Sequence, residues 1–239
     1  MGMNMVKAAN KSVMQNRIWR YERKFFISEH SRYEIEKNIK LHPAFFSEIY
    51  HQRYVNNIYF DSVNMEDYVS NVSGLASRKK VRIRWYGDLF GKIEKPVLEF
   101  KIKRGLVGTK QSYPLDSFVL NKDFNMKDIV EVINKAEVEQ RVKVELKALK
   151  PFLLNRYSRK YFQSVDKNFR LTIDSDLHFY KIDSYHNLFF HNFVDKTNNV
   201  LELKYNEEMD HRADTITNFL PYRMTRSSKY VSGVQVIYG

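Results

Sequence analysis

The stretch KKVRIRWYG, residues 79–87, alternates basic and apolar side chains over most of its length. Because successive side chains of a β-strand point to opposite faces, Arg82 and Arg84 share one face. Val81, Ile83 and Trp85 share the other face. The pattern predicts a strand that is apolar on one side and strongly basic on the other.

Three further segments repeat this arrangement: RYERKF (20–25), VLEFKIKRG (97–105) and VLELKY (200–205). Their polar faces carry Glu22 and Lys24 in the first, Glu99, Lys101 and Lys103 in the second, and Glu202 and Lys204 in the third. A single strand of this kind is ordinarily half-exposed, with its polar face in water. Four strands whose polar faces are dominated by Arg and Lys indicate that these faces together bind a polyanion.

If these faces met inside a barrel, many positive charges would converge. Buried unpaired charges cost several kcal/mol each, so such an interior must stay wet or hold an anion. A linear phosphate chain suits it, because Arg binds phosphate oxygens with two hydrogen bonds and Lys acts as a point charge. The glutamates would repel phosphates unless a divalent cation such as Mg²⁺ or Mn²⁺ joined the two.

The composition narrows the classes of protein further. The 239 residues carry 40 Lys and Arg against 28 Asp and Glu, a net charge of +12 that favours anionic partners. The absence of cysteine excludes disulfides, thiolate metal sites and a cysteine nucleophile. No Walker-type phosphate loop and no close histidine spacing occurs. No signal-peptide core or membrane-spanning stretch is present, so we expect a soluble, cytoplasmic protein.

The order of the predicted elements favours an antiparallel α+β fold. Residues 1–16 are expected to form a flexible tail, and 17–239 a single domain. The predicted strands cover 17–27, 53–62, 79–87, 96–105, 108–115, 153–164, 169–182, 185–194 and 199–206. Helices are expected after Ser31, where Glu34 completes a capping box, and at 64–74, 127–149 and 209–219. Strands and helices do not alternate regularly, which argues against a doubly wound parallel sheet.

The chain resembles the VTC (vacuolar transporter chaperone) polyphosphate polymerase domain, a branch of the triphosphate tunnel metalloenzymes with CYTH-like relatives. The resemblance covers roughly residues 17–239 and rests on RYERKF, NIYFDS, KVRIRWYG, LEFKIKRG, RLTIDSDL, VLELKY, SSKYVSG and the pattern Tyr157–Arg159–Phe162. It implies an eight-stranded antiparallel β-barrel, the triphosphate tunnel, with flanking helices. It also implies metal-dependent transfer of the γ-phosphate of ATP to a growing polyphosphate chain.

The resemblance assigns roles to individual residues. The basic residues of the tunnel would be Lys24, Arg82, Arg84, Lys101, Lys103, Arg159, Arg170 and Lys229. Ser228 and Lys110 would bind substrate, and we add Lys204, which shares a strand face with Glu202. Glu202 matches the metal-binding glutamate of the family, with Glu22 and Glu99 as helpers. Trp85 and Tyr86 are candidates for nucleobase contact, although the apolar face of Trp85 favours core packing.

Three functions fit these residues: synthesis of polyphosphate from ATP, hydrolysis of triphosphate or polyphosphate in the same tunnel, and polyanion binding without catalysis. The SSKYVSG and RWYG segments favour synthesis. Nucleic acid is not expected as a partner, because the Lys and Arg residues are spread over many strands with glutamates among them. Export of a product would need a membrane partner protein.

Overall fold

The computed structural model describes residues 19–239. The predicted tail at 1–16 and the first residues of the predicted strand at 17–27 lie outside this range. Within it, no helix is long and apolar enough to cross a membrane.

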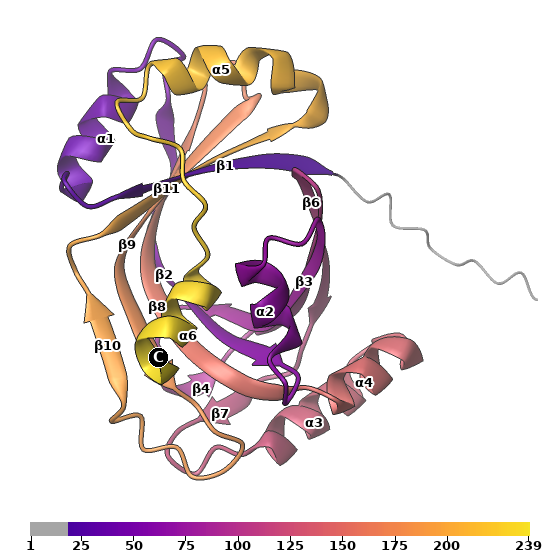
Figure 1. Ribbon diagram of the computed structural model, residues 1–239. Coiled ribbons are helices and arrows are strands. Elements are labelled where there is room, and N and C mark those ends of the chain that lie inside the picture. Colours follow the sequence, from indigo (N-terminus) through magenta and orange to yellow (C-terminus); the bar gives the residue numbers. More distant parts are fainter. Residues whose placement is uncertain (1–18) are drawn as a thin grey trace, which may run out of the picture.

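Eight antiparallel strands form a ring, which closes where the last of the eight pairs with the first (Figure 1). In order around the ring they are β9 (Phe169–Lys181), β11 (Asn199–Asn206), β1 (Arg20–Ile27), β6 (Val107–Pro114), β5 (Val97–Arg104), β3 (Ser77–Tyr86), β2 (Ser47–Asp61) and β8 (Lys150–Gln163). The shortest strand pairing of the ring is between β1 and β6. Among the described residues these strands pair only at Arg20–Gly108 and Tyr21–Val107. The predicted α+β class and the ring of eight strands are confirmed.

Helices cover the outside of the ring at two places (Figure 1). α1 (Arg32–Lys40) and α5 (Asp210–Asn218) pack Ile35 and Ile216 on the apolar face of β1, β9 and β11, where Phe25, Leu171 and Leu201 lie. The predicted capping box of Ser31 and Glu34 begins α1. α5 follows a short 3₁₀ turn, η1 (Glu207–Met209). This apolar face is the one that strand alternation predicts to lie opposite Lys24 and Glu202.

The second cover lies over β3 and β5. Val81, Ile83 and Trp85 pack with Ile129 and Leu146 of two helices, α3 (Met126–Lys135) and α4 (Gln140–Lys147). Trp85 is buried and donates its indole N–H to the carbonyl of Asp88, which confirms the expected core position. A separate pair of short strands, β4 (Gly91–Ile93) and β7 (Phe118–Leu120), adjoins this core.

Two more helices, α2 (Glu66–Val72) and α6 (Lys229–Tyr238), lie at the opening of the ring that faces the viewer in Figure 1. α6 enters the inner side, where Tyr230 stacks on Tyr59 at 5.1 Å between ring centroids. Gly233 allows the close approach: a Cβ there would lie 2.4 Å from Leu153 and 2.5 Å from Phe179. The sequence pattern assigned no helix to this segment.

One predicted strand is mostly wrong. Of residues 185–194 only the last three belong to a strand, β10 (Asn192–Asp195), which pairs with β9 outside the ring. His186 and Phe189 have φ values of 53° and 54°, in the left-handed region, so the chain there is irregular. The segment is rich in aromatic residues, Tyr185, Phe189, Phe190 and Phe193, which are common in strands.

Candidate active site

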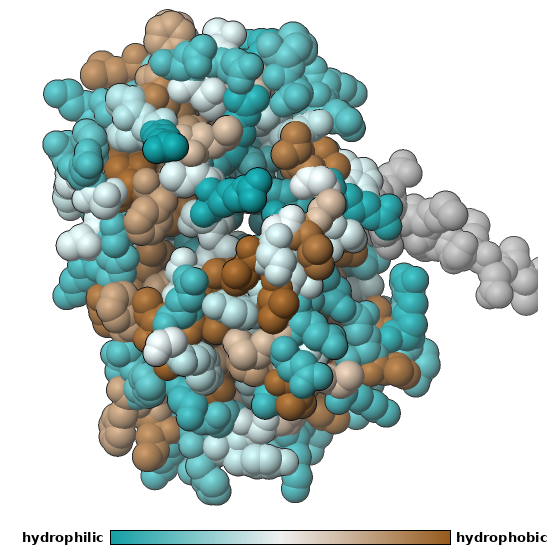
Figure 2. All heavy atoms as spheres, in the orientation of Figure 1, coloured by the Kyte–Doolittle hydropathy of each residue, from teal (hydrophilic) through white to brown (hydrophobic). Residues whose placement is uncertain are grey.

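The register of the ring places the predicted basic residues on its inner face. Directly opposed residues of antiparallel strands share a face. Their pairs are Arg82 with Glu99, Lys80 with Lys101, Lys24 with Glu202, Glu22 with Lys204, Lys204 with Arg170, and Arg159 with Asp174. In Figure 2 hydrophilic side chains lie beside a narrow opening near the middle of the face shown. The ring therefore brings cations from six strands to one interior.

Glu202 is surrounded by four cations from different segments of the chain. Its carboxylate lies 3.0 Å from the Nζ atoms of both Lys24 and Lys204, 3.4 Å from Arg159 and 3.7 Å from Lys229. Burial opposes ionisation of this carboxyl, but the positive charges outweigh it and hold its pKa well below the usual range. Glu202 is therefore an anion at every physiological pH.

Asp174 is a second buried carboxylate and was not predicted as a site residue. It accepts two hydrogen bonds from Arg159, each 2.5 Å long, and lies 2.5 Å from Nζ of Lys229. The salt-bridge partners of Asp174 are therefore Arg159 of β8 and Lys229 of α6. This pair of contacts fixes the C-terminal helix to the wall of the ring.

Tyr157 lies among three cations at the centre of the inner wall. Its hydroxyl accepts a 3.0 Å hydrogen bond from Arg84, and Lys229 and Arg159 lie 4.8 Å and 5.1 Å from its ring centroid. Burial alone would raise the pKa of this phenol, but Arg159 and Arg84 lower it overall. Arg84 also donates to Asn57 at 2.8 Å. These contacts hold Arg84 in one orientation.

Glu22 belongs to the same side of the interior as Glu202. Lys101 donates a 2.8 Å hydrogen bond to one oxygen, while Lys204 lies 3.4 Å from the other. That second oxygen, Oε1, is buried and accepts no hydrogen bond. Burial raises the pKa of Glu22, but Lys101 and Lys24 lower it further, so this carboxylate is also ionised.

Glu99 is held by a different group of cations. Arg82 donates two hydrogen bonds to it, at 2.6 Å and 2.9 Å, Lys110 donates one at 2.7 Å, and Arg84 lies 3.8 Å away. The predicted metal ligands Glu22, Glu99 and Glu202 thus do not form one cluster. Across residues 19–239 no three acidic or histidine side chains gather as a metal site.

Several cations of the interior lack an acidic partner. Lys80, Lys103 and Arg170 form no salt bridge with any residue of the described range 19–239. Lys80 donates instead to the hydroxyl of Ser228 at 2.7 Å. Burial, with Lys24 and Lys101 nearby, lowers the pKa of Lys80. Burial likewise lowers the pKa of Lys101 to about 8. The interior therefore has more basic than acidic side chains.

Sequence reasoning missed Lys80 as well as Asp174 and Tyr157. The signal for Lys80 was available, since it stands two residues before Arg82 and so shares its face. Tyr157 occurs in the quoted Tyr157–Arg159 pattern, and the same rule puts it beside Arg159. Of these three residues, only Asp174 could not be recognised from the sequence, because its position beside Arg159 depends on strand register.

A family model described as the VTC domain matches residues 19–238. The chain belongs to the VTC domain family. The match covers the whole described range except its last residue. No curated protein matches this VTC domain in sequence.

Solved structures share the fold of this VTC domain at low sequence identity. A putative adenylyl cyclase from Hippeastrum, described as having a dominant triphosphatase activity, is similar with a TM-score of 0.54 and 13% identity, over 91% of this chain and 95% of that chain. A protein from Pyrococcus horikoshii OT3 is similar with a TM-score of 0.51 and 11% identity, over 90% and 98% of the two chains. These likenesses establish the tunnel fold.

Two carboxylates of this VTC domain suit a divalent cation. Glu22 and Glu202 stand on the paired strands β1 and β11, and Glu22 has a buried oxygen without a hydrogen bond. Mg²⁺ and Mn²⁺ favour oxygen ligands, and Mg²⁺ in phosphate sites takes one or two carboxylates together with substrate phosphates. The residues present fit such an ion, which Glu22 and Glu202 would hold.

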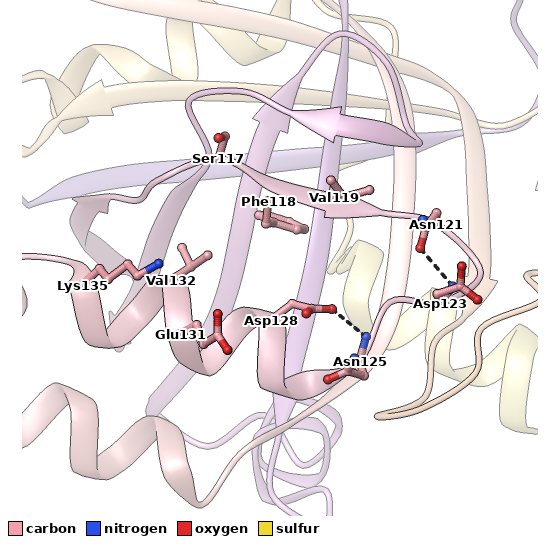
Figure 3. A pocket seen from close by; sticks show the side chains of 10 residues that line it. All are labelled: Ser117, Phe118, Val119, Asn121, Asp123, Asn125, Asp128, Glu131, Val132 and Lys135. Carbon is pink, nitrogen blue, oxygen red and sulfur yellow. Dashed lines mark hydrogen bonds between the residues drawn. The ribbon is translucent and has the colours of Figure 1, made fainter.

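A surface hollow lies away from this interior, between β7 and α3 (Figure 3). Asn125 caps α3 and forms a capping box with Asp128, and the side chain of Asn121 accepts from the backbone of Asp123. Its polar groups thus serve helix capping and a turn. The charged interior, rather than this hollow, is the candidate active site.

Proposed function

We propose that this VTC domain transfers the γ-phosphate of ATP to the end of a growing polyphosphate chain inside the ring. The observation that supports the proposal is the convergence of Arg84, Arg159 and Lys229 around Tyr157 and Glu202. Arginine and lysine fixed by carboxylates offer the positioned donors that phosphoryl transfer needs. Lys80, Lys103 and Arg170, which have no acidic partner within residues 19–239, are available to an anionic ligand.

The reaction requires no nucleophile from the protein. A terminal oxygen of the polyphosphate attacks the γ-phosphorus of ATP, a new P–O–P bond forms, and the bond from that phosphorus to the bridging oxygen of ADP breaks. The negative charge of the transferred group stays within reach of Arg84 and Arg159. A divalent cation at Glu22 and Glu202 would neutralise part of the charge on the phosphate oxygens. Ser228 is no candidate nucleophile, because its oxygen caps α6 and accepts from Lys80.

A triphosphatase of the same ring is the second candidate. The Hippeastrum neighbour is described as having that activity, and the same interior would orient a water molecule in place of the polyphosphate end. Polyphosphate binding without turnover is the third. In each case the anion is ATP, triphosphate or polyphosphate and not nucleic acid. Use of ATP would place the protein in the cytoplasm, with any export carried out by a membrane partner.

One assay separates these functions. The purified full chain is incubated with ATP and Mn²⁺ or Mg²⁺, and the products are sized and quantified. Synthesis gives ADP with an equal amount of phosphate in acid-insoluble polymer. Inorganic phosphate without polymer means hydrolysis, bound but unchanged ATP means a binding module, and no binding contradicts all three.

A matched pair of variants tests the site itself. Arg84→Ala removes a guanidinium from the inner face, and we expect turnover to fall by at least a hundredfold. Arg104→Ala removes one from the exposed end of β5, where it contacts the ring of Trp19. Turnover should stay near that of the wild type in this control. Equal losses in both variants would contradict the assignment of the interior.

A further inference from the structure

Four side chains form a cage at one end of the inner wall: Tyr50, Arg53, Tyr86 and Tyr161. The guanidinium carbon of Arg53 lies 4.6 Å from the ring centroid of Tyr86, 4.8 Å from that of Tyr161 and 5.0 Å from that of Tyr50. Tyr50 also meets Tyr161 edge-on at 5.6 Å. One arginine is thus surrounded by three aromatic rings.

Strand register places this cage on the inner face. Arg53 is paired with Arg159, and Tyr50 with Tyr161, across β2 and β8. Tyr86 stands two residues after Arg84 on β3, so it shares the face of Arg84. The cage also adjoins the phosphate-binding wall, because Arg159 lies 5.9 Å from the ring centroid of Tyr161.

The cage and α6 contact different parts of β2. α6 contacts the inner face at Tyr59, six residues along β2 from Arg53. At about 3.3 Å per residue this separation is about 20 Å. Arg84 lies between them, opposite Asn57. Lys229, the first residue of α6, reaches the ring of Tyr157, which is paired with Val55, so the cage at Arg53 begins just beyond the N-terminal end of α6.

The cage is incomplete in two respects. Tyr50 is 50% and Tyr86 48% exposed, whereas Tyr161 is buried, so two rings present surface to a ligand. Nε of Arg53 is buried and has no hydrogen-bond partner, and no carboxylate within residues 19–239 forms a salt bridge with Arg53. A purely structural arginine in this charged ring would be expected to take an acidic partner, as Arg82 and Arg159 do.

We propose that Tyr50, Arg53 and Tyr86 form a platform for the nucleobase of a nucleoside triphosphate, an inference that rests on the proposed use of ATP. A base stacks on an exposed aromatic ring, and an arginine behind the ring strengthens such contacts. The triphosphate of the same nucleotide then extends inward to Arg159 and Arg84. The platform distinguishes a nucleotide from an inorganic phosphate chain, which has no base.

Binding measurements with two ligands test the platform. The full chain is titrated calorimetrically with ATP and with inorganic tripolyphosphate, both in EDTA so that turnover does not interfere. Stacking on an aromatic side chain contributes about 1–3 kcal/mol per base, which corresponds to roughly a 5- to 150-fold change in affinity. Tyr86→Ala and Tyr50→Ala should weaken ATP binding within this range and change tripolyphosphate binding less than twofold.

Two controls complete the test. Tyr86→Phe keeps the ring and should keep the affinity for ATP. Tyr33→Ala removes an exposed tyrosine of α1 that also has an arginine over its ring, at 4.8 Å, and should change neither affinity. Thermal unfolding of each variant confirms that it is folded.

The outcomes separate this inference from the proposed function. Equal weakening of ATP and tripolyphosphate by Tyr86→Ala would overturn the platform and indicate a role in phosphate binding. Unchanged affinity for ATP in both alanine variants would overturn it as well, while the proposed function would stand. A wild type that binds neither ligand in EDTA, nor after EDTA is replaced by Mn²⁺, would contradict the proposed function, and the platform with it.

Discussion

The hydroxyl of Tyr230 donates a 2.5 Å hydrogen bond to the carboxylate of Asp61, which joins α6 to the end of β2. Asp61 is fully buried and also accepts from the backbone N–H groups of Ser62, Asp67 and Tyr68. Burial, together with this hydrogen bond, raises the pKa of Tyr230. Because Lys229 precedes Tyr230, the same contact holds the Lys229 ammonium group near Glu202 and Asp174.

Removal of this hydroxyl should impair the site more than the fold. Tyr230→Phe leaves Asp61 its three backbone donors, so we expect the free energy of unfolding to fall by about 1–3 kcal/mol. Turnover should fall more than tenfold, because Lys229 loses its support. Tyr238→Phe is the matched control: its hydroxyl donates to the carbonyl of Phe152 at 2.6 Å, at the far end of α6. Urea unfolding and steady-state rates measure both, and an equal loss of turnover in the control would contradict this role.

Gly233 should tolerate no side chain. An alanine Cβ at this position would lie 2.4 Å from Leu153 and 2.5 Å from Phe179, so α6 or the strands must shift. Overpacking of this kind costs about 1–3 kcal/mol and outweighs the gain of up to about 1 kcal/mol from the higher helix propensity of alanine. Chemical denaturation of Gly233→Ala measures whether the free energy of unfolding falls, as expected, or rises. Ser232→Ala, the adjacent change, should be nearly neutral, and stabilisation by Gly233→Ala would show that α6 does not pack as described.

The three predicted metal ligands should respond differently to loss of charge. Glu202→Gln and Glu22→Gln should weaken Mn²⁺ binding in the presence of tripolyphosphate by at least tenfold, because these two carboxylates lie on paired strands. Glu99→Gln should leave Mn²⁺ binding within about twofold, since Arg82 and Lys110 hold that carboxylate elsewhere. Free Mn²⁺ is measured by its paramagnetic resonance signal. Comparable losses of Mn²⁺ affinity in all three variants would contradict the separation of Glu99 from the other two carboxylates.

Anion binding should take up protons above pH 8. Burial is the main cause that lowers the pKa of Lys101 to about 8, with Lys24 and Lys204 adding to the shift and Glu22 opposing it. Between pH 8 and the ordinary lysine value of about 10.5, Lys101 is mostly neutral in the folded protein and protonated in the unfolded chain. Its contribution to stability therefore rises with pH across this window. A bound phosphate favours the ammonium form of Lys101 and raises its pKa again, so binding takes up a proton.

Calorimetry at pH 9 in two buffers of different ionisation enthalpy measures this proton uptake on binding tripolyphosphate. Lys101→Met should reduce the uptake without abolishing it, because the pKa of Lys80 is also lowered. Lys37→Met changes an exposed lysine of α1 and serves as the control. An uptake that Lys101→Met leaves unchanged would contradict the prediction.

Local alternation predicted much of the fold and which side chains of the candidate site share a strand face. The strand β11 has the predicted bounds 199–206, and Arg82, Arg84 and Lys101 lie on the predicted face, because a period of two is a property of neighbouring residues. Helix α1 begins where its capping box predicts. Contacts between residues of different strands could not be predicted in this way, because they depend on how the strands pair. The partners of Asp174 depend on the register of β8 and β9, which shifts between Arg156 and Ser158.

The C-terminal helix was missed for a related reason. The segment KYVSGVQVIY contains β-branched residues and a glycine, which have low helix propensity. Tertiary packing decides instead: Tyr230, Val234 and Ile237 are buried against the inner wall, and Ser228 caps the first turn. The same glycine that disfavours an isolated helix is required where this one meets the strands.

The surroundings of Glu202 have a thermodynamic consequence. Lys24, Arg159 and Lys229 come from distant parts of the chain and meet only when the ring is closed. A phosphate anion that binds among them binds the folded chain and not the unfolded one. By mass action each tenfold rise in free anion above its dissociation constant adds about 1.4 kcal/mol to the stability of the domain. The supply of phosphate compounds would thus raise the free energy of unfolding of this protein, apart from any turnover.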